Sequence, residues 1–131
     1  MKEDTMSERK PFIAGNWKMN LLRSEAADLV NAILPAVFNT DYCDVAVCPP
    51  STSLQIVANA VKGTKLALGA QNCHPSDSGA YTGEVSPPML ADIGCQYVIV
   101  GHSERRQYFK ESDEFINQKV LALYKHQLKP I

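Results

Sequence analysis

The sequence has almost no net charge and no extended basic stretch. Thirteen lysine and arginine residues against fourteen aspartate and glutamate residues give a formal charge of −1 over 131 residues. The only adjacent pair of arginines, Arg105 and Arg106, is too small to form a basic patch. Binding to nucleic acid or to an anionic membrane requires clustered positive charge. We therefore expect neither nucleic acid nor a membrane as a partner.

Long hydrophobic runs are also missing. No run of about 18 apolar residues occurs, so the sequence predicts no membrane-spanning helix. Residues 1–10 are polar and contain no apolar segment of the kind that secretion signals carry. We interpret residues 1–10 as a disordered polar tail and residues 11–131 as one domain, which is long enough to bury a core.

Cysteine is sparse, and no two cysteines have the C-x-x-C spacing. The four are Cys43, Cys48, Cys73 and Cys95. Structural zinc sites draw on closely spaced cysteine and histidine pairs, so the sequence predicts no metal site, and we expect no cofactor. We expect four buried, reduced thiols in a cytoplasmic protein.

Hydrophobic patterning alternates along the chain between short apolar runs and helical spacing. The runs at residues 12–17, 45–48, 66–70 and 97–100 are typical of buried strands. A segment with helical spacing follows each run, and no hairpin signal lies between them. Strands joined through helices are parallel, because each connection must cross over the sheet. The sequence therefore predicts an α/β domain with a parallel sheet.

Helix starts are predicted at four places from capping residues. Ser24 precedes an apolar helical stripe, and Thr52 with Gln55 has the spacing of a capping box. Ser86, followed by proline, is typical of a helix start, and Ser112 has the same role before the last helix.

Two architectures fit this order of elements. A doubly wound sheet would place G-x-G-x-x-G after the first strand, and this motif is absent. Short, uniform strands that each lead into a helix fit part of a (β/α) barrel better. Residues 128–131 have the pattern of another strand. We expect about four βα units plus the start of the fifth strand.

A dense group of polar side chains follows the strand at residues 97–100. His102, Ser103, Glu104 and Arg105 come directly after Gly101. In α/β proteins, sites are built past the carboxyl ends of strands. Taken alone, a histidine there is more often a loop residue and a glutamate is often an exposed helix-start residue, so the local pattern leaves both interpretations open.

Four motifs together resemble triosephosphate isomerase. They are Gly15-Asn-Trp-Lys-Met-Asn20, Gly69-Ala-Gln-Asn72, Gly79-Ala-Tyr-Thr-Gly-Glu84 and Val100-Gly-His-Ser-Glu-Arg-Arg106, and the similarity runs from about Lys10 to Ile131. The family fold is the TIM (β/α)8 barrel of about 250 residues, so the resemblance implies a partial TIM barrel that carries the first half. It also implies the interconversion of dihydroxyacetone phosphate and glyceraldehyde 3-phosphate, a reaction of glycolysis and gluconeogenesis.

The resemblance implies a role for each of four site residues. His102 would be the neutral electrophile that polarises the substrate carbonyl, kept neutral by a helix or turn that begins near Ser103. Lys18 would supply positive charge to the bound substrate, and Asn16 would give it a hydrogen bond. Glu104 would be a buried carboxylate that pairs with Lys18.

The resemblance further implies a subunit interface and an incomplete site. The family's dimer contacts match Gln71, Thr82, Glu84 and Arg105, the first three in the long loop at residues 71–85. The family's catalytic base, a glutamate after the sixth strand, and its phosphate-binding loops have no counterpart here. We expect the chain alone to be inactive and to need a complementary C-terminal half-barrel, or to form a homo-oligomer. The alternative is a self-associating half-barrel with a binding or structural role and no isomerase activity.

Overall fold

The computed structural model describes residues 8–131 and contains one parallel sheet with strand order β1-β2-β3-β4-β5. The strands are β1 (Phe12–Asn16), β2 (Asp44–Cys48), β3 (Leu66–Ala70), β4 (Tyr97–Val98) and β5 (Lys129–Pro130). Every neighbouring pair is parallel. This confirms the expected partial (β/α) barrel with the beginning of a fifth strand.

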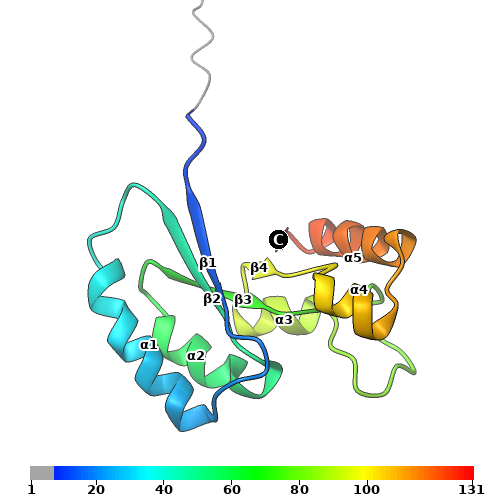
Figure 1. Cartoon of the computed structure of the whole chain (residues 1–131), viewed down its shortest axis with the longest axis horizontal. Coiled ribbons are helices and arrows are strands. Elements are labelled where there is room, and N and C mark those ends of the chain that lie inside the picture. The colour runs from blue at the N-terminus through cyan, green and yellow to red at the C-terminus, as the bar shows by residue number, and fades with distance from the viewer. Residues whose placement is uncertain (1–7) are drawn as a thin grey trace, which may run out of the picture.

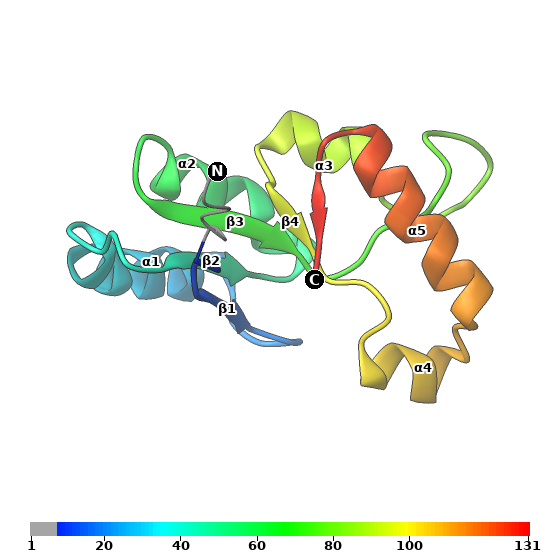
Figure 2. The ribbon, with the colours of Figure 1, turned by 90° about the horizontal axis from the view of Figure 1, so that it is seen from above.

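Helices connect the strands and lie around the outside of the curled sheet (Figures 1 and 2). They are α1 (Arg23–Val37), α2 (Leu54–Val61) with the preceding 3-10 turn η1 (Ser51–Ser53), α3 (Pro87–Ile93), α4 (Ser103–Phe109) and α5 (Asp113–Lys125). The connection from β4 to β5 carries two helices, α4 and α5. The sequence predicted only the second of these as a full helix.

The core fills the space between the sheet and the helices. Its fully or nearly fully buried side chains include Val30 of α1, Val57 of α2, Leu68 of β3, Val98 of β4 and Leu123 of α5. Burying each such side chain contributes about 1.5–3 kcal/mol. Because α1, α2, α3 and α5 all contribute to this one cluster, the strand ends hold fixed positions relative to one another.

Two of the predicted helix caps are confirmed. The Ser86 hydroxyl accepts the Met89 N–H, and α3 ends at Gly94, whose φ of 110° lies in the left-handed region that favours glycine. The Ser112 hydroxyl accepts the Phe115 N–H at the start of α5.

The other two caps are wrong. Ser24 lies inside the first turn of α1, and Glu25 instead reaches back to accept the Leu22 N–H at 2.7 Å. The proposed capping box fails because Thr52 lies inside η1 and α2 starts after it. Gln55 donates along its own helix to Asn59 rather than to the helix start.

The sheet is open at both edges within the described residues. No strand pairs with the outer edge of β1 or of β5 in this part of the chain. The Phe12 ring stacks on the Tyr97 ring at 4.5 Å, whereas Ile13 points the other way and is 57% exposed. The described residues therefore form half of a barrel, in which the curled sheet does not close.

Three expectations concern the start of the chain, its hydrophobic runs and its cysteines. The disordered tail at residues 1–10 stays a prediction: residues 1–7 lie outside the described part, and residues 8–10 are exposed without regular structure. Within residues 8–131, no helix has the length and apolar character needed to cross a membrane. All four cysteines are buried free thiols, as predicted.

Candidate active site

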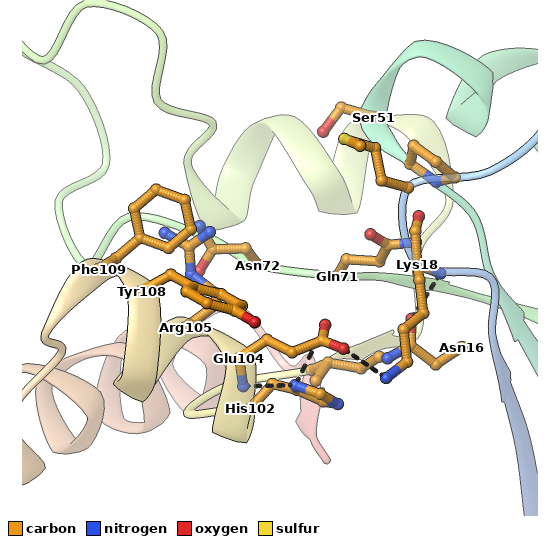
Figure 3. Close-up of a pocket in the computed structure, with 13 residues that line it drawn as sticks. Asn16, Lys18, Ser51, Gln71, Asn72, His102, Glu104, Arg105, Tyr108 and Phe109 are labelled. Atoms are coloured by element: carbon orange, nitrogen blue, oxygen red, sulfur yellow. Dashed lines mark hydrogen bonds and ion pairs between the residues drawn. The ribbon is translucent and has the colours of Figure 1, made fainter.

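A cavity of about 510 Å³ lies past the carboxyl ends of the strands (Figure 3). Its lining comes from the segments that follow β1, β2, β3 and β4 and from α4, and comprises Asn16, Lys18, Met19, Pro50, Ser51, Gln71, Asn72, Ile99, His102, Glu104, Arg105, Tyr108 and Phe109. Parallel strands bring their carboxyl ends to one edge of the sheet, so residues distant in sequence converge there.

Lys18 and Glu104 form an ion pair in this cavity. The Nζ atom of Lys18 lies 2.6 Å from Oε1 of Glu104 although 86 positions separate them in sequence. The hydrogen bond from Lys18 is the largest influence on the carboxyl group and holds the pKa of Glu104 below its usual range. The expectation of a buried carboxylate is wrong, because both side chains are 47% exposed on the open side of the half-barrel.

His102 occupies the N-cap position of α4. Its Nδ1 atom accepts the backbone N–H of Glu104 at 3.1 Å, which leaves Nε2 as the donor nitrogen of the ring (Figure 3). One carboxylate oxygen of Glu104 lies farther from the same Nδ1 atom, at 3.6 Å. The helix expected near Ser103 is thus present as α4, and its N-terminus faces the ring.

The loop after β1 is held by two amide side chains. The Oδ1 atom of Asn16 accepts the backbone N–H of Lys18 at 3.0 Å. The side-chain oxygen of Asn16 is therefore engaged within the loop. Gln71 donates from Nε2 to the backbone carbonyls of Lys18 and Cys48, each at 2.8 Å. Gln71 was expected at a subunit interface, and in this structure it supports the loop that carries Lys18.

A buried ionic network behind the cavity was missed in the sequence. Lys119 donates to both carboxylate oxygens of Glu111 at 3.0 Å and to Oδ1 of Asn72 at 2.8 Å. Arg105 donates to Glu111 from the cavity side and lies over the ring of Phe109. Burial would raise the pKa of Glu111, but hydrogen bonds from Lys119 and Arg105 outweigh it and hold that pKa below its usual range.

One sequence signal could have revealed this network. Lys119 interrupts the apolar stripe of α5, between Ile116 and Leu123, and a lysine on a buried face needs an anionic partner. Its partner Glu111 lies just before the predicted cap Ser112. The partner in the loop after β3, Asn72, could not be inferred from spacing.

The four residues assigned to a subunit interface separate into two groups. Gln71 and Arg105 line the cavity together with the site residues. Thr82 and Glu84 lie in the exposed part of the loop at residues 71–85 and do not line it. The role of all four residues between subunits stays a prediction.

The cavity combines one imidazole, one ammonium group and several amides. Such donors, held at one place, stabilise negative charge that develops on a substrate oxygen. Within residues 8–131, no group of three or more His, Cys, Asp or Glu side chains could hold a metal ion. The imidazole, the ammonium group and the amides of the cavity can act as such donors.

Comparison with known proteins gives a consistent result. The family model described as triosephosphate isomerase matches residues 11–131. Triosephosphate isomerases of Moorella thermoacetica and Alkaliphilus oremlandii are 54% and 58% identical over 123 residues, which are 94% of this chain and 49% of each relative. A crystal structure of triosephosphate isomerase from Bartonella henselae aligns with a TM-score of 0.88 and 39% identity over 93% of this chain and 50% of that one.

The match concerns one part of those proteins. The chain spans about half the length of the curated relatives it matches. Because the family match covers the described domain from β1 to β5, the chain belongs to the triosephosphate isomerase family.

Proposed function

We propose that this chain supplies the charge-stabilising part of a triosephosphate isomerase site. The substrates would be dihydroxyacetone phosphate and glyceraldehyde 3-phosphate, interconverted in glycolysis and gluconeogenesis in the cytoplasm. The observation that carries the proposal is the convergence of Asn16, Lys18, His102 and Glu104 at one cavity, together with the family match.

The reaction moves a proton between adjacent carbons and places negative charge on the carbonyl oxygen. The Nε2–H group of His102 would donate to that oxygen, since Nδ1 is engaged with the Glu104 N–H. Lys18 would add positive charge, and Asn16 would add a hydrogen bond. Groups fixed in this way each contribute about 10²–10³ in rate.

The same cavity offers no suitable proton acceptor. Glu104 is the only carboxylate among its described lining residues, and it is already bonded to Lys18. A catalytic base works best when its pKa lies near the working pH, and the pKa of Glu104 is lowered instead. We therefore propose that the chain alone has little or no isomerase activity and that another half-barrel supplies the base.

The open edges suit such a partner. A complementary C-terminal half-barrel would pair with the outer edges of β1 and β5 and cover the exposed side chains of Phe12, Ile13 and Ile131. The test is aldose–ketose interconversion by the chain alone and after mixing with a chain that carries the complementary half. The proposal expects turnover only in the mixture.

Variants make this assay specific for the site. His102→Gln should lower the turnover of the mixture by about 10²–10³ because it removes the ring donor. His126→Gln is the matched control, since His126 lies at the end of α5 and pairs with Asp77 outside the cavity. Equal losses in both variants would contradict the assignment of His102.

A second candidate function follows from the exposed apolar edge. Ile13 at 57% and Ile131 at 42% exposure flank the two unpaired strand edges, and such surface favours association. The chain would then be a self-associating half-barrel with a binding or structural role. A homo-oligomer in solution that no complementary half converts into an active enzyme would favour this function.

A further inference from the structure

Lys18 has an unusual backbone conformation for its residue type. Its φ is 58°, in the left-handed region that residues with a side chain rarely adopt. Its side chain nevertheless reaches Glu104 across the cavity. Something must hold the backbone in this conformation, because strain of this kind persists only where neighbouring groups over-determine it.

Both polar groups of the Lys18 backbone have side-chain partners. Its N–H donates to Asn16, two residues earlier in the same loop. Its carbonyl accepts the Nε2–H of Gln71, which directly follows β3. The first contact is local and moves with the loop, so of these two backbone partners it is Gln71 that ties the Lys18 backbone to the sheet.

Gln71 is itself fixed by a second contact. Its Nε2 carries two hydrogens, and the second bonds the Cys48 carbonyl at 2.8 Å, which also accepts the Trp17 N–H at 3.1 Å. Cys48 is the last residue of β2 and is fully buried. The amide of Gln71 therefore joins the ends of β3 and β2 to the loop after β1.

We propose that Gln71 is the positioning residue of Lys18: its amide holds the Lys18 backbone in the left-handed conformation that directs the ammonium group into the cavity. Without this donor, the Lys18 carbonyl can turn away, φ can return to negative values, and Nζ leaves Glu104. The inference deepens the proposed function by naming what places its lysine. Its test reads backbone geometry and ionisation, so its failure is distinct from a failure to find isomerase activity.

The test compares Gln71→Leu with the matched control Gln55→Leu, which removes an exposed glutamine bonded only along α2. NMR coupling constants report the φ of Lys18, and a carboxyl titration reports the pKa of Glu104 in the folded 131-residue chain. The Gln71→Leu chain should lose the positive φ, and the pKa of Glu104 should rise to its value in a Lys18→Met chain. Unchanged φ and unchanged pKa in a folded Gln71→Leu chain would overturn the proposal.

A second variant covers the case in which Gln71→Leu does not fold. Glycine holds a positive φ without help. If Gln71 acts through Lys18, the double variant Lys18→Gly with Gln71→Leu should recover folding, as measured by urea unfolding. If the essential contact of Gln71 is instead the one to Cys48, the double variant will stay unfolded, and the proposal fails.

Discussion

Lys119 and Glu111 form a buried ion pair in which the ammonium group lies 3.0 Å from both carboxylate oxygens. Their side chains are 2% and 3% exposed. Through Asn72 and Arg105 the pair joins the loop after β3 to α4. The Glu111 carboxylate therefore holds α4, which forms one side of the cavity, in place.

Replacing this carboxylate should destabilise the fold. Glu111→Gln leaves the Lys119 ammonium buried without a counter-charge, and breaking one partner of a buried pair typically costs about 3–5 kcal/mol. Urea unfolding measures the change. The double variant Glu111→Leu with Lys119→Met should cost clearly less, since it removes both charges. A single variant as stable as the unchanged chain would contradict the role given to this pair.

Stability should fall in acid. The pKa values of Asp77, Glu104 and Glu111 are all lowered. For Asp77 the chief cause is the hydrogen bond from His126, and for Glu104 it is the hydrogen bond from Lys18. For Glu111 burial raises the pKa, but the hydrogen bonds from Lys119 and Arg105 outweigh burial. A carboxyl group whose folded pKa is depressed stabilises the fold above its unfolded pKa, about 4, and loses that contribution as the pH falls through the folded value.

Unfolding free energies measured between pH 3 and pH 7 check this expectation. They should be nearly constant at the upper end and decline below about pH 4. In Glu111→Gln the decline should be shallower, because one of the groups that bind protons on unfolding is gone. A flat profile down to pH 3 would show that these pairs do not contribute.

The contact between β2 and β3 leaves no room for a methyl group at Gly69. A Cβ atom there would lie 2.6 Å from Sγ of Cys48, which is fully buried, so one of the two groups would have to shift. Gly69→Ala should destabilise the chain by about 1–3 kcal/mol, measured by urea unfolding. Gly15→Ala in β1 is the control, because its new methyl group would meet nothing closer than 3.7 Å.

A second substitution tests the cause. If the Cys48 sulfur is the obstacle, Cys48→Ala should recover much of the loss when it is combined with Gly69→Ala. Absence of any recovery would place the strain elsewhere, for example against Tyr97, whose Cβ lies 3.4 Å from the added atom.

The thiols should be inert while the chain is folded. Burial raises the pKa of Cys48 and Cys73 to about 11 and that of Cys95 to about 12, and only the thiolate reacts with alkylating reagents. Iodoacetamide at pH 8 should label the folded chain slowly and the urea-unfolded chain at all four cysteines. Rapid labelling of any of these three thiols in the folded chain would contradict this.

Local patterns predicted the order of elements well. The strand at residues 66–70 and the caps Ser86 and Ser112 depend on neighbouring residues, and the structure confirms them. The error at Ser24 is also local: Glu25 satisfies the N–H of Leu22, so the helix begins earlier without a capping hydroxyl.

The site was predicted less completely, because its support is non-local. The family motifs identified Lys18 and Glu104, and the structure brings them into contact. The contacts of Gln71 with Lys18 and of Lys119 with Asn72 join positions 53 and 47 residues apart, and no spacing rule connects such residues. Their positions follow from the curl of the sheet rather than from any single segment.

The most direct test of the proposed function measures isomerase turnover for the 131-residue chain, alone and together with the complementary half-barrel. The division of roles at the cavity predicts no turnover above background by the chain alone, turnover by the mixture, and loss of that turnover in the His102→Gln chain. Robust turnover by the chain alone would contradict it, since a carboxylate within this chain would then be removing the proton.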